Sequence, residues 1–357
     1  MHSQLRIVIL GLSITSSWGN GHATTYRGLV RELCNRGHEV LFVERDMPWY
    51  AANRDVHVMP PARIELYSSV PQLQERFAAD VRHADAVIVG SYVPEGVAVG
   101  EWVTAMAGGL TAFYDIDTPV TLAKLGQGDT EYLTPALIRR YALYLSFTGG
   151  PILAYLQQRY GAPQARPLYC AIDPRVYYPE PCAARWDLGY LGTYSPDRQP
   201  ALETLLLEPA RRWAQGRFVV AGPLYPPGLA WPSNVQRLEH VPPDEHRAFY
   251  RAQRLTLNIT RADMVRAGYS PSIRLFEAAA CATPMISDYW PGLETLFTPG
   301  QEILVAETPE ETLHYLRGFP ESDLVAMGRR ARARVLAEHT AAHRATELEA
   351  YIRDLQP

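Results

Sequence analysis

Short apolar runs alternate with amphipathic stretches along the chain. The first run, residues 5–12, leads into a Gly/Ser-containing loop, a helical stretch over about 22–36 and a second apolar run over 39–43. A helix that lies between two strands and stops at a glycine is typical of a β-α-β unit. Strand-like runs follow at 63–67, 86–90, 111–114 and 143–147, with helical stretches near 70–82 and 94–106. This alternation predicts a doubly wound parallel sheet.

A proline-rich segment then divides the chain. Residues 168–181 contain three prolines among polar and aromatic residues, which we interpret as an interdomain linker. The alternation restarts beyond it, with strand-like runs near 187–191, 217–221, 235–238, 255–259, 284–287 and 302–305. The sequence therefore predicts two Rossmann-like α/β domains, 1–170 and 185–337, joined by a linker over 171–184. The remaining residues, 338–357, are expected to form a C-terminal helix that could cross back to the first domain.

Two doubly wound sheets that face one another place the carboxyl ends of their strands along a central cleft. We therefore expect the chemistry of this protein in such a cleft. The chain length of 357 residues also suits two domains of ordinary size.

Composition and charge exclude several classes of protein. A net charge of −4 argues against an extended basic surface that binds nucleic acid. The first apolar run is too short to span a bilayer and lacks a signal-peptide cleavage region, so we expect no transmembrane segment and a cytoplasmic location. Four cysteines without a C-x-x-C pair fit reduced, structural thiols: Cys34, Cys170, Cys182 and Cys281. The oligomeric state is not predicted.

The segment 268–281 carries the strongest chemical signal. Ser270 is a good N-cap and Pro271 a good first helical residue, so a helix is expected to start there with its free N–H groups over a glycine turn. Such a helix start is a ready anion site. Arg274 and Glu277 would share one face, offering a guanidinium to a pyrophosphate and a carboxylate to a ribose diol. A surface Arg–Glu pair on a capped helix is the alternative.

Residues 275–288, Leu-Phe-Glu-Ala-Ala-Ala-Cys-Ala-Thr-Pro-Met-Ile-Ser-Asp, with Gly292-Leu293 and Phe297-x-x-Gly300-x-Glu302 downstream, resemble the donor-site signature of GT-B glycosyltransferases, and most closely the CgeB-like branch. The resemblance implies two Rossmann-like domains facing a cleft, with Glu277 on the nucleotide ribose. Where the commoner retaining pattern has a second glutamate, this chain has Tyr269, although the Gly-x-Ser-x-x-Arg-x-x-Glu form resembles the CgeB-like variant. The candidate donor-binding residues here are Gly268, Tyr269, Ser270, Ser272, Arg274 and Glu277.

A second match lies in residues 191–198, Leu-Gly-Thr-Tyr-Ser-Pro-Asp-Arg, after the first strand of the second half. The resemblance implies that Gly192 and Thr193 belong to the donor loop and that Arg198 neutralises the donor diphosphate. Thr193 replaces an arginine often found beside the glycine, and Arg261 could supply the second cation. Taken alone, arginines such as these two are more often plain surface residues, which is the alternative. Cationic side chains and a helix terminus can stabilise a leaving nucleoside diphosphate, so no metal cofactor is expected.

The first half offers candidates for the acceptor side. Gly19-Asn20-Gly21-His22, together with residues 36–40, resembles the GT-B opening pattern, which implies that His22 could deprotonate an acceptor hydroxyl. A loop histidine that satisfies backbone groups is the alternative. Asp115 and Asp117 fall at a strand end and could orient His22 or bind the acceptor, while Asp117 could also be an N-cap. Their D-x-D string is not interpreted as a metal site, because it lies in the half away from the expected donor site.

These features predict a metal-independent, hexosyltransferase-like glycosyltransferase that moves a sugar from a nucleotide-diphosphate sugar to an unidentified acceptor. A nucleotide-sugar epimerase of the same fold and a catalytically silent nucleotide-sugar-binding protein are the alternatives. The missing G-x-G-x-x-G and Walker A patterns weaken dehydrogenase and kinase interpretations. Retention or inversion at the sugar stays open, because no unambiguous base can be named.

Overall fold

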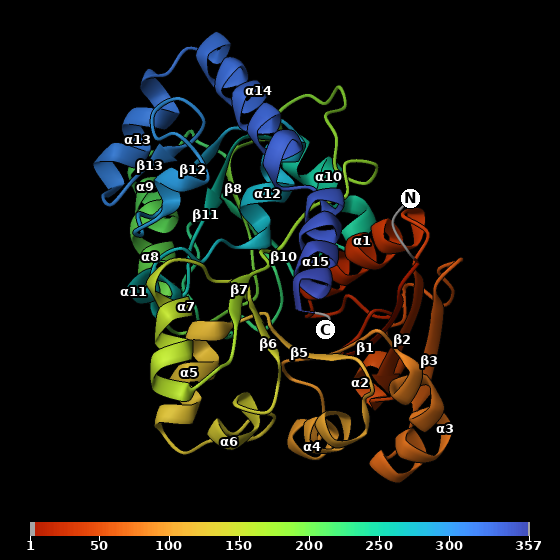
Figure 1. Cartoon of the computed structure of the whole chain (residues 1–357). Coiled ribbons are helices and arrows are strands. Elements are labelled where there is room, and N and C mark those ends of the chain that lie inside the picture. Colours follow the sequence, from red (N-terminus) through yellow and green to blue (C-terminus); the bar gives the residue numbers. More distant parts are fainter. Residues whose placement is uncertain (1–3, 356–357) are drawn as a thin grey trace. The chain divides into compact units, whose positions relative to one another are not determined.

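The computed structural model describes residues 4–355, and the chain forms two compact units (Figure 1). The first unit contains the chain up to Ala171 together with the C-terminal helix α15 (Ala341–Leu355). The second unit runs from Ile172 to Thr340. The two units are described separately below.

The first unit is built on a parallel sheet. Within the described residues it has seven strands in the order β3-β2-β1-β4-β5-β6-β7, and every neighbouring pair is parallel. This is the order of a doubly wound sheet, because the chain starts in the middle and moves outward in both directions. The strands are β1 (Arg6–Gly11), β2 (Glu39–Arg45), β3 (Arg63–Tyr67), β4 (Ala86–Gly90), β5 (Leu110–Asp115), β6 (Leu143–Ser146) and β7 (Ala165–Pro167).

Helices cover both faces of this sheet. On one face α3, α4 and α6 contribute buried apolar side chains to a core shared with β1, β2, β4 and β5. On the other face Tyr26 of α1 packs edge-on against Phe42 and Tyr114, and α15 lies alongside α1 (Figure 1). The helices of this unit are α1 (His22–Asn35), α2 (Pro48–Ala51), α3 (Val70–His83), α4 (Gly96–Met106), α5 (Thr118–Gly126), α6 (Pro135–Ile138), α7 (Pro151–Tyr155), the π-helical turn η1 (Leu156–Tyr160) and α15.

Helix α3 illustrates how the sequence specifies these elements. The Ser69 hydroxyl accepts a hydrogen bond from the Gln72 N–H, which caps the first turn, and a proline follows in that turn. Its buried residues Val70, Leu73, Phe77 and Val81 recur every three or four positions and form the stripe that packs on the sheet.

The second unit has a smaller parallel sheet. Its six described strands run in the order β10-β9-β8-β11-β12-β13, again all parallel. They are β8 (Trp186–Leu191), β9 (Phe218–Ala221), β10 (Val235–Leu238), β11 (Gln253–Asn258), β12 (Met285–Ser287) and β13 (Leu304–Val305). The helical segments are α8 (Gln199–Leu202), η2 (Glu203–Leu207), α9 (Glu208–Arg212), α10 (Pro243–Arg251), α11 (Ala262–Ala267), α12 (Ile273–Ala280), η3 (Leu293–Thr295), α13 (Pro309–Gly318) and α14 (Glu321–Glu338).

The predicted α/β class with two doubly wound parallel sheets is confirmed. The helical stretch at the C-terminal end is divided into α14 and α15. The predicted start of the helix at Ser270 and Pro271 is wrong. Helix α12 begins at Ile273, because Gly268 and Tyr269 have positive φ angles and Ser272 still has an extended backbone. The hydroxyl of Ser272 makes no cap and instead donates to Asn258.

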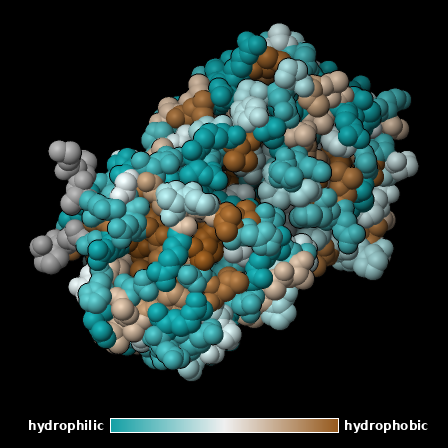
Figure 2. Space-filling view, turned by 90° about the vertical axis from the view of Figure 1, so that its right-hand side faces the viewer, coloured by the Kyte–Doolittle hydropathy of each residue, from teal (hydrophilic) through white to brown (hydrophobic). Residues whose placement is uncertain are grey.

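Figure 2 shows a face of the molecule on which hydrophilic residues predominate and hydrophobic residues gather in small patches. Within residues 4–355, no helix combines the length and the apolar character that crossing a membrane requires.

Candidate functional site

Three arginines gather at the carboxyl edge of the second sheet. Arg198 follows β8, Arg261 follows β11, and Arg274 lies in the first turn of α12. Burial, and then the neighbouring charges of Arg274 and Arg261, lower the pKa of Arg198. The guanidinium groups of Arg274 and Arg261 are therefore each close enough to repel that of Arg198. Like charges held together in this way favour the binding of an anion.

Arg198 keeps hydrogen-bonding capacity that this part of the protein does not use. Its Nη2 donates to the carbonyl of Thr193 at 2.6 Å. Its Nε is buried and has no hydrogen-bond partner among the described residues. Because a buried, unpaired donor is costly, an oxygen-rich anion that accepts from Nε would lower the free energy of this site.

Arg274 is fixed by the strand ends around it. Its Nη1 donates to Asn258 Oδ1 at 2.9 Å and its Nε to the carbonyl of Leu191. Its guanidinium lies 4.9 Å from the centre of the Tyr190 ring, and the residue is 8% exposed. The site therefore holds this charge in place before any ligand arrives, which is how binding groups avoid an ordering cost.

Gly192 provides the space that Arg274 needs. A Cβ atom at this position would lie 2.9 Å from Nη2 of Arg274 and 2.5 Å from the hydroxyl oxygen of Tyr190. The loop after β8 can therefore approach the arginine only because residue 192 has no side chain.

The turn before α12 packs against the loop that follows β12. Gly268 and Tyr269 have φ angles of 68° and 49°, and the Tyr269 N–H donates to the Pro291 carbonyl at 2.6 Å. A Cβ on Gly292 would come 2.5 Å from the Tyr269 ring, so these two segments are in close contact. Ser270 is buried within this turn, at 1% exposure. The Gly292-Leu293 motif thus supports the turn that leads to Arg274.

Two carboxylates lie near the three arginines. Asp197 accepts from the Ala262 N–H at 3.0 Å and from the Ser195 hydroxyl. Asp288 accepts from the Thr260 N–H at 2.8 Å. Although burial opposes it, hydrogen bonds from Ser195 and Ala262 and the charge of Arg261 lower the pKa of Asp197, whereas burial raises the pKa of Asp288. Asp197 also interacts electrostatically with Arg198, so the arginines and these carboxylates form one charged group at this edge.

Glu277 lies inside the second unit. Tyr177 donates its hydroxyl to Oε1 at 2.7 Å, Tyr250 donates to Oε2 at 2.9 Å, and His246 Nδ1 lies 3.8 Å from Oε2. Burial alone would raise the pKa of Glu277, but His246 and the two tyrosine hydroxyls outweigh it and lower that pKa. At 3% exposure, the carboxylate is held by protein groups, and its contact with a ribose stays a prediction.

Sequence reasoning missed several residues of this site. Asn258 joins Arg274 to the hydroxyls of Ser272 and Ser287, and the polar segment at the end of β11 was the available signal. Arg237 stacks 4.1 Å from the Tyr225 ring centre and 4.6 Å from that of Trp231. The Tyr225 hydroxyl donates to the Gly192 carbonyl at 3.2 Å, which ties this aromatic group to the arginine site.

The predicted acceptor-side residues lie in the first unit, at the carboxyl edge of its sheet. His22 begins α1 and packs edge-on against Phe147, with 5.5 Å between ring centres. Asp117 is partly exposed and accepts from the Tyr92 hydroxyl at 3.1 Å. It is the N-cap residue of α5, but its side chain makes no capping hydrogen bond.

Asp115 has a different environment. It has no exposed surface and accepts hydrogen bonds from the hydroxyls of Tyr144 and Thr121 and from the Asp117 N–H. Burial raises the pKa of Asp115 to about 6. The structure favours a positioning role for this carboxylate at the end of β5, and its catalytic assignment stays a prediction. Among residues 4–355, no three His, Cys, Asp or Glu side chains gather in a way that could hold a metal ion.

Comparisons with known proteins agree with this geometry. Residues 198–350 match a family described as "Glycosyl transferase-like", and this region holds Arg198, Arg261, Arg274 and Glu277. The chain has a glycosyltransferase-like fold. Its two parallel-strand sheets match those of GT-B glycosyltransferases. No curated protein matches the chain.

Solved structures align over nearly the whole length. Sucrose-phosphate synthase from Thermosynechococcus elongatus has a TM-score of 0.72 at 14% identity, with 98% of this chain and 99% of that one covered. HepE from Anabaena, solved with UDP-glucose, has a TM-score of 0.73 at 13% identity, with coverages of 99% and 100%. An alpha-glucosyltransferase solved with UDP has a TM-score of 0.71 at 11% identity, with coverages of 98% and 100%. At these identities the likeness establishes the fold.

Proposed function

We propose that the protein is a metal-independent glycosyltransferase that moves a sugar from a nucleoside-diphosphate sugar to an acceptor hydroxyl. The observation that carries the proposal is the group of three arginines at the carboxyl edge of the second sheet, where Arg198 keeps a buried, unpaired Nε. A diphosphate would bring negative charge to these guanidinium groups and oxygen atoms that can accept a hydrogen bond from Arg198 Nε.

The same group suits the chemistry of transfer. The acceptor oxygen forms a bond to the anomeric carbon while the bond from that carbon to the diphosphate breaks. The hydroxyl proton passes to a base, for which His22 is the candidate, and the nucleoside diphosphate leaves with the bonding electron pair. Charge grows on the leaving diphosphate during this step, so fixed guanidinium groups would stabilise the transition state without a metal ion.

Three finer assignments belong to the proposal. UDP is the first nucleotide to test, because HepE and the alpha-glucosyltransferase were solved with UDP or UDP-glucose. The Gly-x-Ser-x-x-Arg-x-x-Glu form over residues 268–277 supports a place in the CgeB-like branch. The small number of cysteines, none of which forms a disulfide within the described residues, supports a cytoplasmic location. No observation on the described residues favours an epimerase or a silent binding protein.

Calorimetric titration with UDP and other nucleoside diphosphates tests the donor site. We expect Arg198→Gln to weaken binding by about 1.5–3 kcal/mol, the scale of a lost charge-assisted hydrogen bond. Arg211→Gln is the matched control, because Arg211 lies in α9 of the same unit and pairs with Glu203 and Glu208 on its surface. Equal affinities in wild type and Arg198→Gln would remove the site assignment.

Product analysis with UDP-glucose and other nucleotide-sugars tests the reaction. Release of nucleoside diphosphate, by transfer or by slow hydrolysis, would support a glycosyltransferase. A changed sugar on an intact nucleotide would identify an epimerase, and tight binding without turnover would identify a silent binding protein.

A further inference from the structure

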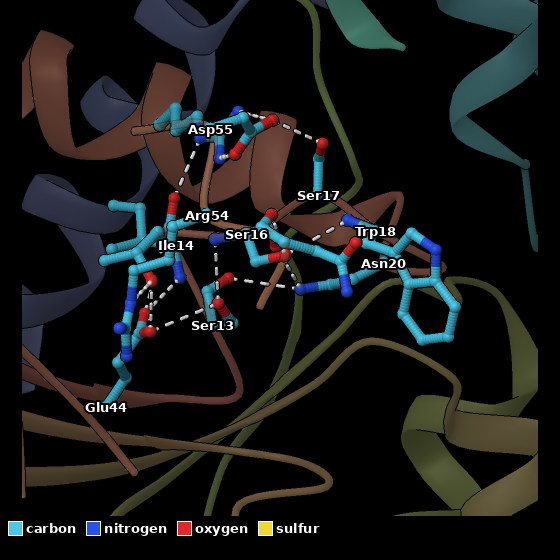
Figure 3. Close-up of polar contacts among 12 residues, drawn as sticks. Ser13, Ile14, Ser16, Ser17, Trp18, Asn20, Glu44, Arg54 and Asp55 are labelled. Atoms are coloured by element: carbon cyan, nitrogen blue, oxygen red, sulfur yellow. Dashed lines mark hydrogen bonds and ion pairs between the residues drawn. The ribbon is translucent and has the colours of Figure 1, made fainter. Parts of the chain in front are cut away.

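The loop between β1 and α1 in the first unit is tied down by hydrogen bonds. Its anchor is Glu44 at the end of β2, which has no exposed surface. The N–H groups of Ile14 and Thr15 donate to Glu44 Oε2 at 2.6 and 3.1 Å, and the hydroxyls of Ser13 and Thr15 donate to Oε1 (Figure 3). A buried carboxylate that accepts four hydrogen bonds fixes the groups that donate them.

A second set of contacts joins this loop to the segment that follows β2. The N–H groups of Asp55 and Val56 donate to the carbonyl of Thr15, and the Ser16 hydroxyl donates to the carbonyl of Asn53. The Ser17 hydroxyl donates to Asp55 (Figure 3). The loop is therefore held both by Glu44 at the end of β2 and by the segment that follows β2.

This fixed loop presents an aromatic ring to its surroundings. Trp18 is 40% exposed, and its backbone N–H donates to the Ser16 hydroxyl at 3.3 Å. Its indole ring points away from the hydrogen-bonded cluster (Figure 3). An indole exposed to this degree on a rigid loop offers contact area at little ordering cost. It also stands at the carboxyl edge of a doubly wound sheet, where such folds bind ligands, and four residues before His22.

The charges around this loop indicate what kind of ligand it suits. Three arginines near this loop are each paired with a carboxylate: Arg27 of α1 with Asp55, Arg54 of the segment after β2 with Asp46, and Arg45 at the end of β2 with Glu95. Paired arginines give no surplus charge to a phosphorylated ligand.

We propose that Trp18 and its loop form the acceptor platform, and that the acceptor is an uncharged carbohydrate. A sugar ring carries C–H groups on one face and hydroxyls at its rim, so it can stack on the indole while its hydroxyls meet the polar groups beside it. The inference rests on the proposed function, because only a transferase has an acceptor.

Saturation-transfer NMR on the full chain tests this platform, with maltose, cellobiose and sucrose as uncharged probes and glucose 6-phosphate as the charged one. Wild type should bind at least one uncharged probe more tightly than the phosphate. Trp18→Ala should raise the dissociation constant of that probe by about tenfold, the scale of a lost aromatic stack, and Trp18→Tyr should restore most of the binding. Trp49→Ala is the matched control, because Trp49 is 49% exposed on the neighbouring segment and makes none of the contacts described above.

Calorimetry with UDP on the same variants separates this inference from the proposed function. Unchanged UDP affinity in Trp18→Ala, with saccharide binding lost, would support both. Saccharide binding that survives Trp18→Ala, binding of the phosphorylated probe alone, or no binding of any probe would overturn the platform while UDP binding still supports the donor site. Absence of UDP binding in wild type would instead remove the proposed function.

Discussion

At the scale of single residues, Gly192 matters for the side chain that it lacks. An alanine there would place a methyl group 2.9 Å from Arg274 Nη2. Because Arg274 is held by Leu191 and Asn258, it can move away only by giving up those hydrogen bonds. We expect Gly192→Ala to weaken nucleoside-diphosphate binding by about tenfold or more, which corresponds to about 1.4 kcal/mol. Calorimetric titration with UDP measures the effect.

Gly228→Ala is the control for this substitution. Gly228 lies in the same unit, and a Cβ there would meet nothing within 4 Å. The Gly228→Ala protein should therefore bind UDP with the affinity of the wild type. If Gly192→Ala also bound normally, then the loop after β8 would have room to adjust, and the close approach seen here would have no bearing on ligand binding.

Residue types could be predicted from the sequence, but their partners could not. The motif singled out Glu277, yet Tyr177 and Tyr250, which hold its carboxylate, stand 100 and 27 positions away in the chain. Glu44 gave no signal at all, because a single glutamate at the end of an apolar strand is identified as an anchor only by the loop that folds over it. Such pairings arise from the tertiary fold, which a local pattern does not contain.

At the scale of elements, periodic segments were predictable and their ends were not. The strands at 63–67 and 86–90 fall where the apolar pattern places them. The start of α12 does not, since the Ser270-Pro271 rule considers only local capping, whereas contacts with Pro291 and Asn258 hold residues 269 and 272 out of the helix. Strand β7, three residues long, is too short to show a pattern.

Helix α15 is attached to α1 by a charged group that titrates in acid. Arg36, Arg353 and His38 surround Glu349, whose side chain is 6% exposed. Although burial opposes it, hydrogen bonds from Arg36 and Arg353 and the nearby His38 ring lower the pKa of Glu349 to about 2. A folded-state pKa below the unfolded value of about 4.3 gives stability that is complete above about pH 5 and is lost as the pH falls toward 2.

We therefore expect Glu349→Gln to lower the free energy of unfolding by about 1–2 kcal/mol at pH 7, after allowance for solvent around Arg36, and by about half as much near pH 3. Denaturant unfolding of both proteins at the two pH values measures this. Asp354→Asn, at an exposed position of the same helix, should show no such pH-dependent difference. A Glu349→Gln penalty that was equal at pH 7 and pH 3 would contradict the assignment.

At the scale of the whole molecule, each unit has its own sheet and its own buried core. The repeated β/α alternation was sufficient to predict two sheets of the same class, because each strand and helix buries an apolar stripe of recognisable period. The donor candidates all lie in one unit and the acceptor candidates in the other. Binding of the nucleotide should consequently depend on the second unit alone.

Removal of residues 341–357 would test whether nucleotide binding depends on the second unit alone. Helix α15 belongs to the first unit, where the Ala341 methyl lies over Gly28, the Tyr351 hydroxyl donates to the Pro167 carbonyl at 3.1 Å, and Leu348 and Ile352 have no exposed surface. Loss of those two apolar side chains alone would cost the first unit about 3–6 kcal/mol. Hydrogen exchange in the truncated chain should therefore accelerate in β1 and β2 and stay slow in β8 and β11, while UDP affinity is retained. Faster exchange in both sheets, or a loss of UDP binding, would mean that the donor site depends on the first unit as well.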